Sequence, residues 1–306
     1  MIPFWFIFQE CNCLVKFMLF RCVDSICMFH IKKMSFGDLE FAVQITDQMS
    51  WNFVEEDFKF MMELEPEGCF VLLHDSERVG IATAVCFGKI GWFGNFIVDE
   101  SHRNRGAGSM LVKHAVKYLK SRNVETIGLY SYIEKIPFYE RLGFKYDSEF
   151  VVVEGKGLPQ QSKPNLWKVQ NENIQDVIDY DCSCFGGSRK KLLESILLNS
   201  VNTCYLCIEG RQIIGYGVAK VYGEMAELGP LVCKKGRGDV AVKLLWANLN
   251  GLEGFEVSGC VPKKELAIIS MLRENKFTEK FRVARMFLGS PIARDCIYVA
   301  ESLERG

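Results

Sequence analysis

Apolar runs long enough to cross a bilayer are missing from this sequence. The N-terminal run MIPFWFIF is followed at once by Gln9 and Glu10, and the later apolar runs are broken by charged residues. None reaches the roughly 18 to 20 apolar residues of a transmembrane helix, and no positive charge precedes the first run as it would in a signal peptide. We therefore predict no transmembrane segment. Residues 1–33 are interpreted as an extension of uncertain structure, dispensable upstream of Met34, with a peripheral membrane contact as the alternative.

The chain also has no excess of charge of either sign. It carries 37 Lys and Arg against 38 Asp and Glu, a formal net charge of -1. Nucleic acids and anionic membranes are bound through broad positive fields, which this balance does not supply. The composition therefore excludes nucleic acid as the main partner, and any recognition of phosphate must be local.

Metal-binding and disulfide patterns are absent as well. The 13 cysteines form an odd set without a CxxC pair, and only four histidines are scattered through the chain. Structural zinc needs paired Cys or His ligands at short spacing, so we predict no metal site. Unpaired cysteines in such number are typical of buried thiols in a reducing compartment. They predict a cytoplasmic protein.

An internal repeat organises the remaining chain, whose 306 residues are enough for two domains. When Cys69 is set against Cys204 without a gap, Gly80, Gly88 and Gly94 pair with Gly215, Gly223 and Gly229. Glycines that match at one constant spacing indicate that the two segments share the same backbone conformations, rather than only a similar hydrophobicity. We predict two lobes of one design, 34–154 and 165–306. The Gly- and Pro-rich segment 155–164 reads as the linker between them.

The first lobe predicts strands followed by a long helix. The runs CFVLL, VGIATAVCF and WFGNFIV are β-branched and aromatic and are separated by short polar turns, as in an antiparallel meander. After Gly106, apolar residues recur at helical spacing, and TIGLYSY, a short helix around IPFYERLG and a last strand from Phe144 follow. The order predicts an α/β (α+β) fold in which each lobe is a mixed, mostly antiparallel sheet flanked by helices.

The strongest chemical signal is the segment from Arg103 to Gly108, RNRGAG, at the start of that long helix. Glycines allow the backbone to approach a ligand closely, and the unpaired amides of a first helical turn bind phosphate oxygens. The segment lacks the third glycine of a dinucleotide fingerprint and the Gly-Lys-Ser/Thr of a P-loop. A pyrophosphate site of another kind is therefore expected.

The RNRGAG turn, followed some thirty residues later by FYERLGF, resembles the GNAT superfamily of acyl-CoA-dependent N-acyltransferases. The resemblance implies that the backbone of Ile97 and Val98 pairs with the pantetheine arm of acetyl-CoA, next to a bulge at Gly94 and Asn95. It implies that the pyrophosphate lies on Arg103, Asn104, Arg105, Gly106, Ala107, Gly108 and Ser109. It also implies that Tyr139 protonates the departing thiolate, although a packing role for this tyrosine is the alternative.

The extended pattern, from SWNFVEEDF to CFGGSRKKLL and VARMFLG, resembles a tandem subgroup in which a complete acetyltransferase domain precedes a reduced GNAT-like one. In the repeat, Leu272 of the second lobe stands opposite Tyr139, and the phosphate turn is not retained. We expect the second lobe to close an acceptor pocket. Its candidate residues, for which core packing or ordinary salt bridges are the alternatives, are Trp51, Asp57, Phe185, Arg189 and Arg285.

These observations favour an N-acetyltransferase that moves the acetyl group of acetyl-CoA to an amine by direct attack. The amine is expected to be a small molecule rather than a protein. The alternative is a non-catalytic acyl-CoA-binding module for regulation or scaffolding. Retention of the phosphate turn and Tyr139 in one lobe, and loss of both in the other, favours the enzyme.

Overall fold

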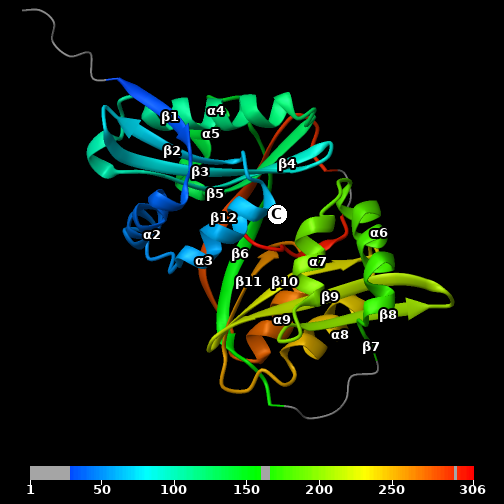
Figure 1. The fold of residues 1–306 in the computed structure, drawn as a ribbon. Coiled ribbons are helices and arrows are strands. Elements are labelled where there is room, and N and C mark those ends of the chain that lie inside the picture. Colours follow the sequence, from blue (N-terminus) through cyan, green and yellow to red (C-terminus); the bar gives the residue numbers. More distant parts are fainter. Residues whose placement is uncertain (1–27, 160–165, 293–294) are drawn as a thin grey trace, which may run out of the picture.

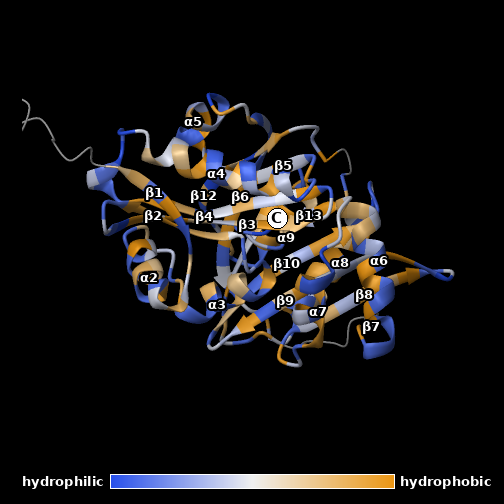
Figure 2. Ribbon diagram, turned by 45° about the horizontal axis from the view of Figure 1, so that its top comes forward, coloured by the Kyte–Doolittle hydropathy of each residue, from blue (hydrophilic) through white to orange (hydrophobic). Residues whose placement is uncertain are grey.

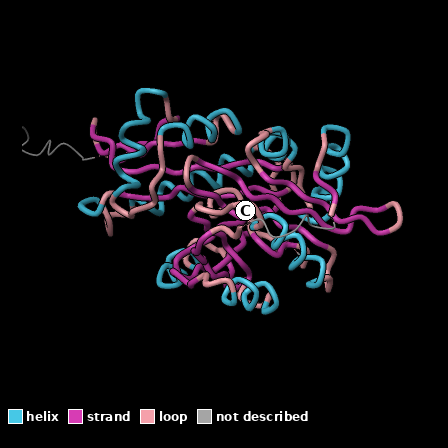
Figure 3. The backbone as a smooth tube through the Cα atoms, turned by 90° about the horizontal axis from the view of Figure 1, so that it is seen from below, coloured by secondary structure: helices cyan, strands magenta, loops and turns pink. Residues whose placement is uncertain are grey.

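The computed structural model describes residues 28–159, 166–292 and 295–306, in which the strands of both lobes form one continuous sheet (Figures 1 and 3). The strand order is β1-β2-β3-β4-β5-β12-β6-β11-β10-β9-β8-β7, and β13 pairs with β10. Helices cover both faces of the sheet (Figure 3). The mixed, mostly antiparallel α/β class expected from the sequence is confirmed.

The first lobe contains the elements from β1 to β6. They are β1 (Phe29–Lys33), η1 (Phe36–Asp38), α2 (Leu39–Asp47), α3 (Glu55–Leu64), β2 (Cys69–His74), β3 (Glu77–Phe87), β4 (Ile90–Val98), η2 (Glu100–His102), α4 (Ala107–Ser121), β5 (Thr126–Tyr132), η3 (Ile133–Lys135), α5 (Ile136–Glu140) and β6 (Lys145–Lys156). The expected meander is β2-β3-β4, and the expected long helix is α4. Its apolar stripe of Leu111, Ala115 and Leu119 is fully buried because it packs on this meander.

The second lobe repeats this order with shorter connections. Its elements are β7 (Trp167–Lys168), η4 (Asn171–Asn173), α6 (Ile174–Phe185), α7 (Lys190–Leu198), β8 (Thr203–Glu209), β9 (Gln212–Tyr222), β10 (Met225–Cys233), α8 (Gly238–Leu249), β11 (Glu256–Pro262), α9 (Leu266–Glu274), β12 (Thr278–Leu288) and β13 (Ile297–Val299). The alignment of Tyr139 with Leu272 holds in three dimensions. The amide of Phe144 donates to the Tyr139 carbonyl at 3.1 Å, and that of Phe277 to the Leu272 carbonyl at 3.0 Å.

The two lobes exchange their last long strands. In the first lobe β5 pairs with β12 of the second, from Ile127↔Leu288 to Tyr132↔Val283. Strand β6 pairs on its other side with β11, from Phe150↔Pro262 to Lys156↔Glu256. The repeat alone leads to the simpler expectation of a separate sheet for each lobe. The structure instead joins both lobes through β12 and β6, which also pair with each other.

Strand β1 differs from the expectation for residues 1–33. Phe29–Lys33 pair in antiparallel register with β2, from Phe29↔His74 to Lys33↔Phe70. Lys32 reaches the buried carboxylate of Asp38 at 2.7 Å. These five residues therefore form a strand at the edge of the sheet. Residues 1–27 lie outside the described residues, as does 160–165 of the proposed linker.

The largest hydrophobic core lies between the lobes. It joins α2 and α3 of the first lobe with α6 and α7 of the second, and includes Phe58, Trp92, Phe185 and Tyr216. A separate core lies beneath α4 and α5, and another beneath α8 and α9. Hydrophobic and hydrophilic residues alternate along the helices (Figure 2). Since the central core draws on both lobes, it fixes their relative position.

Candidate functional site

Strands β4 and β5 pair over only a short stretch and then part. Their parallel ladder runs from Ile90↔Thr126 to Trp92↔Gly128. Beyond it, β4 continues on β3 as far as Val98, and β5 continues on β12 as far as Tyr132. The backbone of β4 from Phe93 onward therefore has no strand on its β5 side among the described residues. Such an edge can accept hydrogen bonds from, and donate them to, an extended ligand.

A bulge lies where the strands part. Asn95 and Phe96 of β4 together oppose Ala82 of β3, because Ile81 pairs with Ile97 while Thr83 pairs with Gly94. Asn95 adopts a φ of 43°, in the left-handed region. An extra residue bends a strand and increases its twist. The expected bulge at this step is present, and it turns β4 away from β5.

The turn before α4 opens toward solvent. Arg103, Asn104, Arg105 and Gly106 are exposed, and Gly106, with a φ of 84°, begins the helix without any side chain to cap it. The amides of Ala107, Gly108 and Ser109 precede the first intrahelical hydrogen bond, which the Met110 amide donates to Gly106 at 3.0 Å. Unpaired amides at the positive end of the helix dipole bind anions. Arg103 is partly engaged, since its Nε donates to the Val98 carbonyl at 2.8 Å.

Aromatic residues connect this turn to Tyr139. A Cβ atom at Gly108 would lie 3.2 Å from Phe96 and 3.5 Å from Phe138. The ring of Tyr139 contacts those of Phe96, Phe138 and Phe144 at centroid distances of 6.3, 5.0 and 5.9 Å. The bulge, the first turn of α4 and the phenol therefore belong to one packed unit.

Burial raises the pKa of the Tyr139 phenol well above its ordinary value near 10. Only 6% of the residue is exposed, and its hydroxyl forms no hydrogen bond to the part of the chain that the structure describes. A phenol with a raised pKa stays protonated at neutral pH and can donate a hydrogen bond or a proton. The environment of Tyr139 therefore suits a proton donor, and the ring of Tyr139 also packs in the core.

Two of the sequence-derived pocket residues have structural partners within the first lobe. Asp57 accepts a hydrogen bond from the Val54 amide at 2.8 Å and so caps α3. Trp51 donates from Nε1 to the hydroxyl of Tyr132 at 3.1 Å. Trp51 also packs against the core that joins the two lobes. Asp57 acts as a cap in this arrangement.

The other three are buried between the lobes. Phe185 lies in the core, with the Arg189 guanidinium 4.2 Å from its ring centroid. Arg189 donates to both carboxylate oxygens of Asp181, at 3.1 and 2.6 Å. Arg285 donates to Asp147 at 2.8 Å. Each arginine is thus paired with an aspartate, as the ordinary salt-bridge reading has it.

In the second lobe the corresponding strand edge is filled by the chain itself. Strands β10 and β11 pair in parallel from Met225↔Glu256 to Leu228↔Gly259. Beyond Leu228, β13 takes the place on β10, with Leu231↔Val299 and Val232↔Ile297. Ala300 then donates to the Cys260 carbonyl of β11 at 2.9 Å. A ligand strand has no room on this edge, which is the structural counterpart of the motifs lost from the sequence.

Two of the three cations before α8 are engaged in ion pairs. Arg237 pairs with Asp239 at 2.9 Å and with Glu209 at 2.7 Å, and Lys235 pairs with Asp295 at 3.0 Å. Ion pairs of this kind neutralise the charge that a phosphate would need. The second lobe therefore offers no equivalent of the turn at Arg105.

Nothing in the sequence indicates what the C-terminal tail, residues 300–306, contributes. It enters between the lobes (Figure 1), where the Trp92 indole donates to the Leu303 carbonyl at 3.4 Å. Glu301 is fully buried and pairs with Lys220 at 2.7 Å and Arg305 at 2.9 Å. The spacing of Glu301 and Arg305 was visible in the sequence, but their burial depends on the fold.

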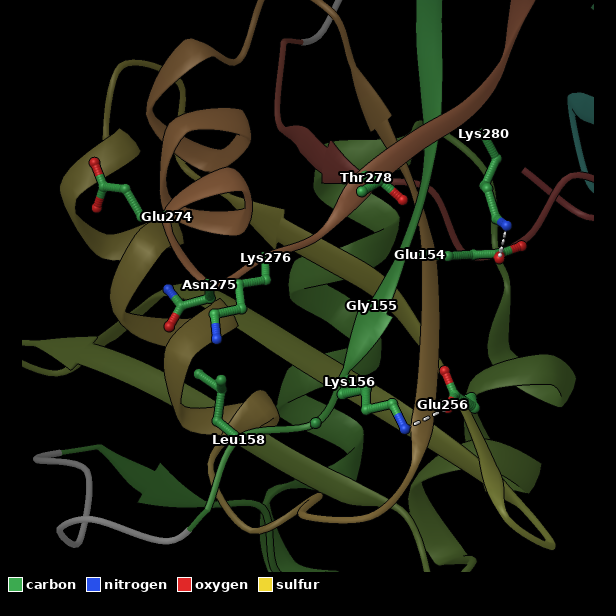
Figure 4. A pocket seen from close by; sticks show the side chains of 11 residues that line it. Glu154, Gly155, Lys156, Leu158, Glu256, Glu274, Asn275, Lys276, Thr278 and Lys280 are labelled. Carbon is green, nitrogen blue, oxygen red and sulfur yellow. Dashed lines mark ion pairs between the residues drawn. The ribbon is translucent and has the colours of Figure 1, made fainter.

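A hollow lies away from these residues, between the end of β6 and the end of α9 (Figure 4). Its volume is about 590 Å³. Two of its lysines are paired, Lys156 with Glu256 at 3.1 Å and Lys280 with Glu154 at 2.9 Å. It contains none of the residues predicted for the cofactor or the acceptor. An open hollow with paired charges carries no functional assignment.

Two further classes of site were sought within the described ranges. No cluster of three or more His, Cys, Asp or Glu residues there could hold a metal ion. No helix in those ranges is both long and apolar enough to cross a membrane.

Sequence models of known protein families match both lobes. A sequence model described as the acetyltransferase (GNAT) family matches residues 36–144, and one described as an acetyltransferase (GNAT) domain matches residues 177–298. The two matches coincide with the two halves of the internal repeat. They leave residues 1–35, 145–176 and 299–306 outside.

Two curated relatives are similar to parts of the chain. The uncharacterized N-acetyltransferase YitH of Bacillus subtilis is 25% identical over 175 residues, which are 55% of this chain and 59% of the relative. The uncharacterized N-acetyltransferase MJ1207 of Methanocaldococcus jannaschii is 31% identical over 112 residues, 32% of this chain and 46% of the relative. The chain thus spans about half the length of the curated relatives that it matches.

Solved structures share the complete two-lobe arrangement. A putative acetyltransferase from Pyrococcus horikoshii superposes with a TM-score of 0.75 at 24% identity, covering 91% of this chain and 96% of that one. A GCN5-related N-acetyltransferase from Sphaerobacter thermophilus gives 0.59 at 15% identity, covering 90% and 98%. At these identities the likeness concerns the fold.

Proposed function

Because the chain belongs to the GNAT acetyltransferase family and carries two of its domains in tandem, we propose that it transfers an acetyl group from acetyl-CoA to a small amine. The first lobe performs the reaction. The second lobe supports it and closes the acceptor side. The alternative of a non-catalytic acyl-CoA-binding module has no observation of its own in its favour.

One observation carries the proposal: the parted strands β4 and β5 lead to the uncapped first turn of α4. Among the described residues no strand covers the β5 side of β4 around Ile97 and Val98, and this edge suits the amides of a pantetheine arm. The amides of Ala107, Gly108 and Ser109, with Arg105 beside them, suit a pyrophosphate. Both features meet in the first lobe, whereas β13 fills the matching edge in the second.

The residues of the first lobe would divide the work of an acyl transfer. Acetyl-CoA supplies an activated acyl group in its thioester. The β4 backbone orients the extended arm, and the turn from Arg103 to Ser109 holds the phosphates, which fixes the distance along the arm to the reacting carbonyl. The phenol of Tyr139 holds the proton that the thiolate needs on leaving.

Cofactor binding can be tested by thermal stability. A ligand selective for the folded state stabilises it by about 2.7 kcal/mol at 100 times its Kd, so acetyl-CoA should raise the melting temperature by several degrees. Arg105→Glu places a negative charge beside the phosphates and should abolish this rise. Arg105 is exposed, so its replacement should leave the unliganded melting temperature unchanged.

The matched control is Lys120→Glu, which makes the same change of charge at an exposed position in the last turn of α4. It should keep the full rise. An equal rise in Arg105→Glu would place the cofactor elsewhere. Release of free CoA in the presence of primary amines then separates an enzyme from a binding module.

We also propose that the protein works in the cytoplasm. All nine cysteines in the described ranges are free thiols. Such thiols persist in a reducing compartment, where acetyl-CoA chemistry can also proceed.

A further inference from the structure

The C-terminal tail meets the first lobe where β4 leaves β5. A Cβ atom at Gly94 would lie 2.6 Å from both the Cα and the carbonyl oxygen of Glu304. This contact is possible only because residue 94 has no side chain. The tail backbone therefore rests directly on the bulge of β4, at the level where the ladder between β4 and β5 has ended.

Buried contacts hold the tail in this place. Glu301 binds Lys220 of β9 and Arg305 of the tail itself. Arg305 also lies 5.5 Å from the ring centroid of Phe60 in α3. Arg189 donates to the Gly306 carbonyl at 2.5 Å. These contacts, most of them with the second lobe, thus hold the tail in a fixed position against the first lobe.

Unsatisfied polar groups surround the point of contact. The hydroxyl of Thr83 and both side-chain polar atoms of Asn95 are buried without a hydrogen bond, and so is the hydroxyl of Tyr130. Thr83 of β3 pairs with Gly94 of β4, and Asn95 is the next residue of β4 after Gly94. Tyr130 lies on β5, with its ring 5.2 Å from that of Trp92. Buried polar groups normally have partners, so a cluster without them indicates a place where a polar ligand binds.

Glu304 is the acidic side chain of the tail that lacks an ion pair. No Lys or Arg nitrogen of the described residues lies within 4.0 Å of its carboxylate, whereas Glu301 has two such partners. The charged and titratable groups around it are Arg305 of the tail, Glu227 of β10 and the Cys260 thiol of β11. Burial raises the pKa of the Glu304 carboxyl above its ordinary value.

We propose that Glu304 binds the amine of the acceptor and takes its proton, and that the acceptor is a cationic amine with hydroxyl or carbonyl groups but no carboxylate. The inference rests on the proposed acetyl transfer. The carboxylate faces the ammonium, and Thr83, Asn95 and Tyr130 provide neutral hydrogen-bonding groups. A carboxylate on the acceptor would need a cation, but the buried Arg189, Arg285, Lys220 and Arg305 are each paired with Asp or Glu.

The chemistry balances with acetyl-CoA and the amine alone. Glu304 accepts one proton from the ammonium, and the freed lone pair of the nitrogen forms a bond to the thioester carbonyl carbon. The carbon–sulfur bond breaks, and its electron pair leaves with the sulfur. Tyr139 protonates the thiolate, and the nitrogen then loses its second proton, which restores the phenol. The products are an amide, CoA and the proton held on Glu304.

The test uses the full chain, acetyl-CoA and two pairs of probes. Serinol and serine differ by a carboxylate, as do ethanolamine and glycine. Thiol release should be at least tenfold faster for the member without the carboxylate. Glu304→Gln should lower kcat/KM for it roughly 10² to 10⁴-fold, the scale of a lost general base, while the Kd of acetyl-CoA stays within about twofold. The variant should also lose the rise of rate with pH that follows ionisation of Glu304.

Glu224→Gln, the same change at an exposed turn between β9 and β10, should behave as the wild type. Glu304→Asp keeps the charge and should retain part of the activity. Wild-type turnover in Glu304→Gln or equal use of serine and serinol would each overturn this inference alone. Binding of acetyl-CoA without turnover of any primary amine would overturn the proposed acetyl transfer, and this inference with it. Failure of the wild type to bind acetyl-CoA would overturn the proposed function, and this inference with it.

Discussion

At the scale of single residues, Tyr139 is the group whose removal separates packing from proton transfer. Tyr139→Phe keeps the ring contacts with Phe96, Phe138 and Phe144 but removes the proton. We expect turnover to fall roughly 10² to 10⁴-fold and the acetyl-CoA Kd to stay constant. Turnover is measured by the release of free thiol with time, and the acetyl-CoA Kd by titration calorimetry.

The pH profile follows from the direction of the pKa shift. A phenol acts as an acid only while protonated, and its contribution is lost as the pH rises through its pKa. Burial raises that pKa, so the loss moves above the ordinary value of 10. The wild-type rate should therefore show no descending limb from Tyr139 up to pH 10. Tyr146→Phe, at an exposed phenol on β6, is the control; wild-type rates in Tyr139→Phe would assign the proton to water.

Some site residues could be read from the sequence because their chemistry is local. Arg105, Gly106 and Gly108 stand next to the helix that they begin, so spacing alone indicates their surroundings. Glu304 lies more than two hundred residues from Gly94, and nothing in its neighbourhood suggests the contact. The position of a tail that crosses between lobes is determined by tertiary packing, and local sequence patterns do not indicate such packing.

At the scale of elements, the pairing of β1 with β2 predicts that the folded region begins before Met34. A chain beginning at Met34 would lose the ladder with β2 and the bond from Lys32 to the buried Asp38. Backbone hydrogen bonds contribute about 0.5–1.5 kcal/mol each, and bonds to charged groups about 1.5–3 kcal/mol. We expect such a chain to melt several degrees lower than one beginning at Met28, as measured by calorimetry.

The chain from Met28 serves as its control, since it retains the whole of β1. Equal melting temperatures for the two would show that the strand contributes nothing to stability. Acetyl-CoA binding should persist in both, because the turn before α4 does not touch β1 through any hydrogen bond among the described residues.

The longer elements were predictable because each repeats its periodicity several times. Alternating β-branched runs separated by polar turns identify β2, β3 and β4, and the buried stripe of α4 identifies the helix. FHIKK and IYV are too short to show a period. Their strands form because an open sheet edge is available, in β2 for the first and in β10 for the second.

At the scale of the whole molecule, the asymmetry of the lobes predicts the number of cofactors. The edge of β10 is filled by β13, and Leu272 stands where the first lobe has Tyr139. Titration calorimetry should therefore give one acetyl-CoA per chain, and Arg105→Glu should reduce this to none. A value of two would mean that β13 leaves its place.

The repeat could not predict the exchange of β6 and β12. Matching at a fixed offset shows that two segments fold alike, but either last strand satisfies the same hydrogen bonds and the same apolar faces. Sequence thus predicted two similar units and left the connection between them undetermined.

The exchanged strand has a consequence for the order of events during biosynthesis. Strand β5 ends at Tyr132, but its partner β12 ends at Leu288, so the ribosome must add more than 150 further residues before the first lobe can complete its sheet. At about 5–20 residues per second this takes roughly 10 to 30 s. The nascent first lobe keeps an open strand edge throughout that interval, and only a fully translated chain can close it.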